Sequence, residues 1–304
     1  MRRTKSKDLE KVLKRVKSLE KKNPINKEIL DFFKEIIREQ YKAKPIIKIE
    51  PIEVQKETIK DQLMAGFPLI DKNGLKLDID SAKIIFKNIC KALREKNKKV
   101  APWIRIINKS IKSKDISLEE LYKKMIEGDD TYINSISDKI GINKWLLNIL
   151  LENSIKPIFE SYAERLKDYI EQESWFKGSC PICGSEPFLG ELKDYANVVG
   201  AKFLICSLCG FHWRYKRLGC PFCSNDNHQK LRYFNTEADG KAYRIDVCEE
   251  CKRYIKTIDT KIIGDVISPL IEDISTLHLD IIAKNEGYKG RNTELLEKER
   301  YGVA

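Results

Sequence analysis

The first part of the chain shows a helical spacing of hydrophobic positions, with apolar residues three and four apart between charged ones. Two apolar stripes lie near its start, one made of Leu9, Val12, Leu13, Val16 and Leu19 and the next of Ile29, Phe32, Phe33, Ile36 and Ile37. Each stripe places apolar side chains on one face of a helix. We therefore expect two amphipathic helices, followed by an extended linker at residues 45–51, where the helical spacing is lost.

The helical pattern continues to about residue 177. A further helix is predicted after an N-cap at Asp80 or Ser81, and its buried face consists of Ile85, Phe86, Ile89, Cys90 and Leu93. Two more helices are expected at residues 118–126 and 142–151. Because proline is favoured in the first turn of a helix, Pro157 is expected to begin a last helix that ends near Trp175.

The pattern changes after Lys177, where short β-type runs at residues 202–205, 231–234 and 243–247 alternate with turns such as Asp239-Gly240. This segment repeats itself. Its Cys-Pro-Ile-Cys at residues 180–183 returns 40 residues later as Cys-Pro-Phe-Cys, and Cys206/Cys209 returns 42 residues later as Cys248/Cys251. The repetition predicts two modules of one design in tandem.

A final helix is expected after residue 258, with Ser268 as its N-cap and Pro269 at its first position, followed by a polar tail from Lys289 onward. Its apolar face consists of Leu270, Ile274, Leu277 and Ile281. The predicted fold is α+β. An all-helical domain at residues 1–177 precedes two tandem rubredoxin-like or zinc-ribbon modules at 178–260 and a closing helix with its tail at 261–304.

Composition indicates a globular protein, since 304 residues with 42% hydrophobic side chains can form two cores. No uncharged apolar stretch reaches the roughly 18 residues that a membrane-spanning helix needs, and the charged start does not resemble a secretory signal. We expect a cytoplasmic protein without a membrane span. The net charge of +11 comes from residues 1–100, which hold 27 basic and 15 acidic side chains, whereas residues 179–260 hold 12 and 10.

Eight of the nine cysteines form four Cys-x-x-Cys pairs: Cys180, Cys183, Cys206, Cys209, Cys220, Cys223, Cys248 and Cys251. In a lysine-rich chain without a secretory signal, such pairs indicate metal ligands rather than disulfides. Two intervening residues let both thiolates of one tight turn bind a single ion, and two turns complete a tetrahedral site. The chain therefore predicts two metal ions, each zinc or iron, because both tolerate four thiolates.

We pair the turns in sequence order, so that the first and second share one ion and the third and fourth share the other; interleaved or nested pairings use the same cysteines. Four protein ligands leave no open position for substrate, so no catalytic residue is predicted. The ions then act at least as staples of a small β domain. Gly184 and Gly210 follow the first two turns, whereas Ser224 and Lys252 follow the others, which predicts a more labile second site.

Other candidate residues have ordinary interpretations as well. Trp213, Arg214 and Arg217 mix aromatic and basic character between the modules and are expected either to pack there or to dock a partner. His212 lies close enough to Cys209 to replace a ligand, but a role at the surface or beside the site is favoured. Cys90 is expected to be a core residue.

Three other function classes also use paired cysteines. A nucleic-acid-binding zinc ribbon is the main alternative. However, two sites, each with four thiolates and one divalent ion, together carry a charge of −4, so the net charge of residues 179–260 changes from +2 to −2. A negative net charge favours a protein partner. An electron-transfer protein would need iron in the sites. A dithiol-exchange enzyme normally has one exposed pair at the start of a helix, unlike the four pairs here.

The chain resembles the formate dehydrogenase accessory protein family, FdhE. The resemblance rests on the Cys-Pro-Ile-Cys-Gly-Ser-Glu-Pro run at 180–187, on the order of the other three pairs with Trp213 and Arg217 between them, on Tyr254 and Lys256, and on the Glu-Gly-Tyr at 286–288. It covers residues 150–290 best.

The resemblance implies a cytoplasmic, non-catalytic maturation factor that binds the catalytic subunit of a molybdenum- or tungsten-dependent formate dehydrogenase during assembly. It also implies that the eight paired cysteines are metal ligands in rubredoxin-like sites, which serve as structural or redox-sensing elements. The family supplies no catalytic residue to carry over. Neither nucleic acid nor a membrane is expected as a partner.

Overall fold

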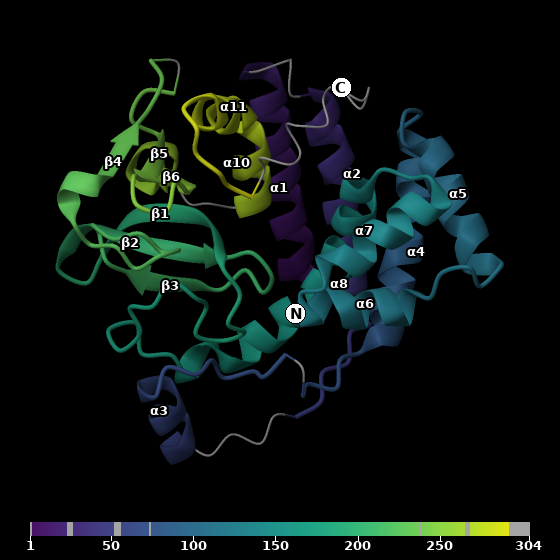
Figure 1. Cartoon of the computed structure of the whole chain (residues 1–304), viewed down its shortest axis with the longest axis horizontal. Helices are drawn as coiled ribbons and strands as arrows, with labels where there is room; N and C mark the ends of the chain where they lie inside the picture. The colour runs from purple at the N-terminus through teal and green to yellow at the C-terminus, as the bar shows by residue number, and fades with distance from the viewer. Residues whose placement is uncertain are drawn as a thin grey trace. The chain divides into compact units, whose positions relative to one another are not determined.

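A computed structural model describes residues 2–22, 27–51, 56–72, 74–237, 239–264 and 268–291. The protein is α+β, as predicted, with helices in the first half followed by one mixed six-stranded sheet and short C-terminal helices (Figure 1). None of the helices in these ranges is both long and apolar enough to cross a membrane. Within these ranges the chain forms two compact units, one from residues 2–51 and 71–162 and the other from residues 56–70 and 163–291.

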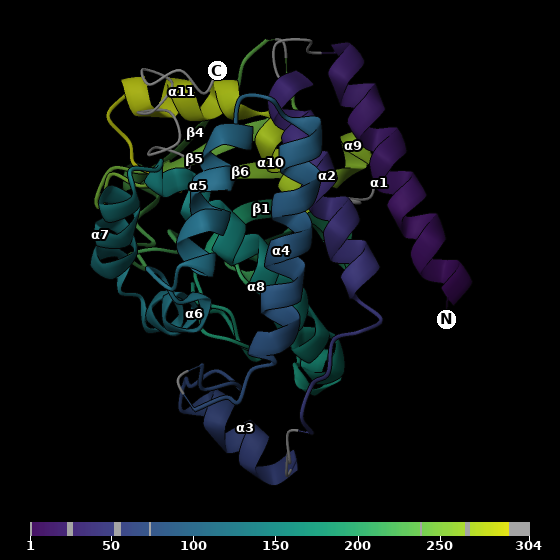
Figure 2. The ribbon, with the colours of Figure 1, turned by 90° about the vertical axis from the view of Figure 1, so that its right-hand side faces the viewer.

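The first unit is helical. It contains α1 (Arg2–Lys22), α2 (Lys27–Ala43), α4 (Ile79–Lys96), α5 (Ala101–Lys112), α6 (Leu118–Glu127), α7 (Asp130–Ile140) and most of α8 (Lys144–Leu166). Helix α2 packs between α1 and α4 (Figure 2). The apolar stripes seen in the sequence provide the core, since Val16, Phe33, Ile36 and Phe86 are almost completely buried.

The start of α4 corrects a sequence prediction. The N-cap is Asp78, not Asp80 or Ser81, because the Asp78 carboxylate accepts hydrogen bonds from the Ser81 amide (3.0 Å) and hydroxyl (2.6 Å). The same carboxylate accepts a hydrogen bond from the Lys48 amide in the extended linker. Helices α5 and α7 were not predicted, whereas the helix expected at 118–126 agrees with α6.

Pro157 does not begin a helix, contrary to the sequence prediction, but lies inside the continuous helix α8, which ends at Leu166 rather than near Trp175. A proline within a helix leaves the carbonyl four residues earlier without its usual donor. Here that carbonyl belongs to Asn153, and Gln40 Nε2 on α2 donates to it at 2.8 Å. A tertiary hydrogen bond therefore replaces the missing helical one.

The second unit contains α3 (Lys56–Met64), a 3-10 turn at Lys167–Tyr169, and the six strands. These are β1 (Pro187–Tyr195), β2 (Val198–Cys206), β3 (His212–Tyr215), β4 (Leu231–Phe234), β5 (Tyr243–Cys248) and β6 (Tyr254–Asp259), with a 3-10 turn at His228–Lys230 before β4. The three β-type runs of the sequence lie in β2, β4 and β5. This division by packing differs from the predicted domain boundaries at residues 177 and 260, which stay predictions.

The strands form a single sheet in the order β3-β2-β1-β6-β5-β4. Each module contributes three antiparallel neighbours, and the modules join through the parallel pair β1 and β6, in which Leu189 faces Lys256. The second module therefore lies beside the first in the sheet, and its corresponding strands run in the same direction. Tandem modules are confirmed, but they share one sheet.

The chain after the sheet forms α9 (Thr260–Ile263), α10 (Pro269–Ser275) and α11 (Leu277–Asn285). The one final helix of the sequence prediction is thus two helices, broken at Thr276, whose hydroxyl donates to the carbonyls of Glu272 and Asp273 (both 3.0 Å). Leu279 and Ala283 of α11 pack on Ile245 and Val247 of β5. The expected polar tail lies outside the described residues beyond residue 291.

Candidate metal centres

Each Cys-x-x-Cys pair lies in the same tight turn, repeated at Cys180, Cys206, Cys220 and Cys248. In every turn the amide of the first cysteine donates to the carbonyl five residues later, and its carbonyl accepts from the amide four residues later, at 2.8–3.2 Å. These hydrogen bonds define the shape of each turn. Both sulfurs of a pair can then point toward one position.

The structure brings the eight sulfurs into two clusters of four. Cys180, Cys183, Cys206 and Cys209 form the first cluster, and Cys220, Cys223, Cys248 and Cys251 the second; within each, the sulfurs all lie within 4.8 Å of one another. The sequential pairing of the turns agrees with this arrangement, and the interleaved and nested pairings do not. All nine cysteines are free of disulfides.

The two clusters differ in their packing. In the first, all four cysteines are buried, and the Cys180–Cys209 and Cys183–Cys206 sulfurs are 3.5 and 3.4 Å apart. In the second, the corresponding distances are 3.6 and 3.7 Å, Cys223 is exposed and Cys251 half-buried. The second cluster is therefore more accessible to solvent, whereas the greater lability expected from its sequence stays a prediction.

The residue that follows each turn also differs between the two clusters. Gly184, Gly210, Ser224 and Lys252 all adopt a left-handed conformation, with φ of 71°, 67°, 60° and 54°. Glycine reaches this region without strain, whereas a residue with a Cβ atom does so at a cost. The second cluster is thus built on two strained turns.

The topology places both clusters at the same end of the sheet. The first turn directly precedes β1 and the second follows β2, which runs antiparallel to β1. The third turn precedes β4 and the fourth follows β5 in the same way. Because β1 and β6 are parallel, the cysteine turns of both modules lie at the same end of the strands.

The electrostatics of the first cluster fit a bound cation. Burial raises the pKa of the Cys180 and Cys209 thiols well above the ordinary value, whereas hydrogen bonds from the neighbouring cysteines lower that of Cys183. Four buried thiolates repel one another, and only a cation makes their joint ionisation favourable. An all-sulfur set of four suits zinc or iron.

A segment distant in sequence, residues 68–70, contacts the first turn, and no sequence pattern indicates this contact. We call it the strap. The amides of Leu69 and Ile70 donate to the carbonyls of Pro181 and Ile182 at 2.9 and 2.8 Å. Pro68 approaches Gly184 so closely that an added Cβ would lie 3.1 Å from its ring. These residues occupy the loop after α3, whose sequence carries no signal beyond its turn-forming glycine and proline.

The residues proposed for partner docking occupy different environments. Trp213 is fully buried, and its Nε1 donates to the Lys177 carbonyl at 2.9 Å, so its ring supports the first module from within. Arg214 is half-buried and pairs with Glu173. Arg217 is exposed and donates to the Val199 carbonyl at 3.1 Å. Of the three, Arg217 is thus the most accessible to a partner.

The remaining candidates have structural partners. His212 Nδ1 lies 3.0 Å from Glu191 Oε2 and is not part of either cysteine cluster. Cys90 is completely buried on α4, and burial raises the pKa of its thiol. Neither residue therefore has the surroundings of a ligand or nucleophile.

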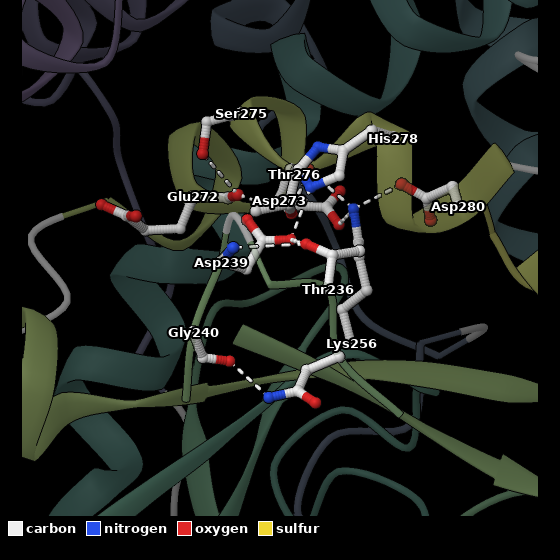
Figure 3. Close-up of polar contacts among 11 residues, drawn as sticks. Thr236, Asp239, Gly240, Lys256, Glu272, Asp273, Ser275, Thr276, His278 and Asp280 are labelled. Atoms are coloured by element: carbon white, nitrogen blue, oxygen red, sulfur yellow. Dashed lines mark hydrogen bonds and ion pairs between the residues drawn. The ribbon is translucent and has the colours of Figure 1, made fainter. Parts of the chain in front are cut away.

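A buried polar cluster ties the C-terminal helices to the sheet (Figure 3). The Lys256 ammonium on β6 lies 2.7 Å from a carboxylate oxygen of Asp273 and 2.5 Å from one of Asp280, and Tyr254 donates to Asp280 at 2.7 Å. Although burial opposes it, the two carboxylates raise the pKa of Lys256. The sequence indicates Lys256 only as part of the family resemblance and does not predict its burial or its two ion pairs.

Two protein-family models match this half of the chain. The model described as "FdhE, central domain" matches residues 179–217, and "FdhE, C-terminal domain" matches residues 218–296. The first match spans the first cysteine cluster and β1–β3, and the second spans the other cluster, β4–β6 and the C-terminal helices. The boundary between the two matches falls between the modules.

Similar proteins extend the likeness to the helical half. The FdhE homolog of Aquifex aeolicus (strain VF5) is 30% identical over 93% of this chain and 93% of its own length. Protein FdhE of Escherichia coli (strain SMS-3-5 / SECEC) is 23% identical over 90% of this chain and 82% of its own. The crystal structure of the FdhE protein from Pseudomonas aeruginosa has the same fold, with a TM-score of 0.63, 19% identity and 91% coverage of both chains.

Proposed function

The chain belongs to the FdhE family, and from that membership we propose that it is an assembly factor that binds the catalytic subunit of a molybdenum- or tungsten-dependent formate dehydrogenase during maturation. It catalyses no reaction itself. Its eight paired cysteines ligate two metal ions, and its helical part, residues 1–177, contributes to docking of the client. This subunit is called the client below.

The geometry that carries the proposal is the pair of complete four-sulfur clusters at one end of the sheet. An ion held by four protein sulfurs has no coordination position left for substrate or activated water. What the ions supply is folding free energy, because their binding fixes four turns that carry only short strands between them. A rigid sheet with two such sites suits recognition of another protein.

The direct test is capture of the client. The full chain carrying an affinity tag would be made together with the catalytic subunit of a formate dehydrogenase from the same cell, and purified without oxygen. We expect the subunit to be retained by the wild-type chain and by Cys90→Ser, which leaves both clusters intact. If neither retains the subunit from cells that contain both, the proposed function is wrong.

The nature of the ions is tested separately by elemental analysis of the anaerobically purified protein. We expect two ions per chain, zinc or iron, with the rubredoxin-type absorption of iron if iron is bound. A reversible one-electron couple would add a redox-sensing role to the structural one. Fewer than one ion per chain would contradict the assignment of the cysteines.

A further inference from the structure

A small cleft of about 60 Å³ lies on the second module beside its cysteine cluster. We call it the arginine cleft. It is lined by Lys202 of β2, Arg217–Phe222, Arg244 and Asp246 of β5, Arg253, and the neighbouring residues of β4–β6. Arg244 and Asp246 alternate along β5 with Ile245 and Val247, which pack against α11. The side chains of Arg244 and Asp246 therefore lie on the sheet face opposite α11.

The cleft holds more positive than negative charge. Its lining contains five basic side chains, Lys202, Arg217, Arg232, Arg244 and Arg253, and a single acidic one, Asp246. Arg253 is neutralised by Glu186 outside the cleft. Among the described residues, no carboxylate forms an ion pair with Arg217. The cleft is thus electropositive even beside a cysteine cluster that carries negative charge when metallated.

One excess positive charge lies at the centre of the cleft. Asp246 lies between Lys202, at 2.7 Å, and Arg244 Nε, at 2.8 Å, and these three side chains are 16%, 2% and 21% exposed, respectively. One carboxylate thus balances two cations that are largely removed from water. Arg244 Nε is buried against Asp246 Oδ1, although its N–H is not aligned for a hydrogen bond with it. An anion that enters the cleft would balance the excess charge of this group.

The rim of the cleft is apolar and exposed. Leu218 and Tyr233 are 63% and 65% exposed, and the Arg244 guanidinium lies 4.8 Å from the centroid of the Tyr233 ring. The turn at Cys220-Pro221-Phe222 forms another wall. The volume suits one small side chain rather than a large ligand.

We propose that the arginine cleft receives one carboxylate side chain from an acidic, partly apolar segment of the client, with Arg244 as its ion-pair partner and Tyr233 and Leu218 contacting its apolar neighbours. This inference rests on the proposed function. A nucleic acid is less suitable, because a phosphate backbone needs an open track of basic side chains, whereas Arg244 lies in a small cleft that admits one side chain.

The test measures the affinity of purified client for the full metallated chain and for three variants. Arg244→Gln removes the excess charge while leaving Asp246 paired with Lys202. Tyr233→Ser removes the exposed ring. Lys241→Gln makes the same charge change as Arg244→Gln at an exposed turn outside the cleft. Metal content and the thermal unfolding midpoint are measured for each variant, and binding of a fluorescent 20-nucleotide oligothymidylate is measured in parallel.

We expect Arg244→Gln to weaken client binding by roughly tenfold or more, the value of a lost charged hydrogen bond, with a smaller loss for Tyr233→Ser and none for Lys241→Gln. Wild-type affinity should also fall with salt. If the wild type binds and Arg244→Gln, still folded with two ions, binds equally well, only this inference is wrong. If the wild type does not bind, the proposed function fails too. Oligonucleotide binding that depends on Arg244 while client binding does not would assign the cleft to nucleic acid.

Discussion

Arg253 forms a bidentate ion pair with Glu186, with Nη1 2.9 Å from Oε1 and Nη2 2.6 Å from Oε2. Glu186 directly precedes β1, and Arg253 directly precedes β6, so the pair lies where the two modules join. The Arg253 guanidinium also lies 3.7 Å from the centroid of the Phe222 ring, in the third cysteine turn. One side chain therefore connects the module junction to the second metal centre.

Arg253→Ala is expected to lower the free energy of unfolding by about 1–2 kcal/mol, since it removes a stacked and partly exposed ion pair. It should also accelerate metal release from the second cluster. Glu186→Gln keeps the stacking, so we expect a loss below about 1 kcal/mol. Urea unfolding and a colorimetric metal-release assay measure both effects. Equal losses for the two variants would contradict a role for the Phe222 contact.

The same pair gives stability a pH dependence. Hydrogen bonding to Arg253 holds the pKa of Glu186 below its ordinary value of 4.5 in the folded state. A carboxyl with a lowered folded pKa contributes stability that is complete above its unfolded pKa and is lost as the pH falls through the folded one. We expect the stability difference between wild type and Glu186→Gln, measured with metal bound, to shrink below pH 4.5.

The metal centres could be predicted from sequence almost completely, because two cysteines separated by two residues specify a local turn. The four turns followed from spacing, and the sequential pairing, one of the arrangements that the sequence allowed, agrees with the clusters. The greater lability of the second site stays a prediction. The strap at Leu69 and Ile70 could not be predicted, because it depends on backbone amides that any residue supplies. For Trp213, the sequence left packing and docking open, and its burial agrees with packing.

The fold was predictable where one pattern dominated. Apolar stripes marked α1, α2 and α4, and β-type runs marked three strands. Pro157 was placed at a helix start, because its local preference does not show that Gln40, distant in sequence, satisfies the Asn153 carbonyl. The union of both modules in one sheet depends on the parallel pairing of β1 and β6, which leaves no sequence signature.

Chelator treatment is expected to remove the two ions at different rates. The second cluster should lose its ion first, because Cys223 is exposed and Cys251 half-buried, whereas the first cluster is buried throughout. Cys223→Ser should abolish the fast phase of metal release, and Cys180→Ser the slow one. Cys90→Ser should keep two ions and both phases. A single phase in the wild type would contradict the difference between the clusters.

Ser224→Gly and Lys252→Gly are each expected to stabilise the metallated protein by about 0.5–1 kcal/mol, since glycine relieves the left-handed strain but also increases the entropy of the unfolded chain. Gly184→Ala should destabilise it, because the new Cβ combines that strain with the contact to Pro68. Thermal unfolding with excess metal checks the signs. Destabilisation by both glycine substitutions would show that the turns of the second module are not strained.

Gln40→Leu is expected to cost about 1–3 kcal/mol, because it leaves the buried Asn153 carbonyl without a donor. Pro157→Ala restores an amide N–H that can donate to the same carbonyl within α8. The double variant should therefore be more stable than Gln40→Leu alone, by an amount that a double-mutant cycle measures in urea. Additive effects of the two substitutions would show that the amide of Gln40 does not compensate for the proline.

Lys256→Met is expected to be the most destabilising of these substitutions, at about 3–5 kcal/mol, because it leaves Asp273 and Asp280 buried without their common cation. Adding Asp280→Asn removes one uncompensated charge and should recover part of the loss. Lys261→Met, which breaks an exposed pair with Asp194, is the control and should change stability by less than about 0.5 kcal/mol. Urea unfolding with metal bound measures all three. A loss for Lys256→Met as small as that of the control would show that the ion pairs of Lys256 do not hold α10 and α11 to the sheet.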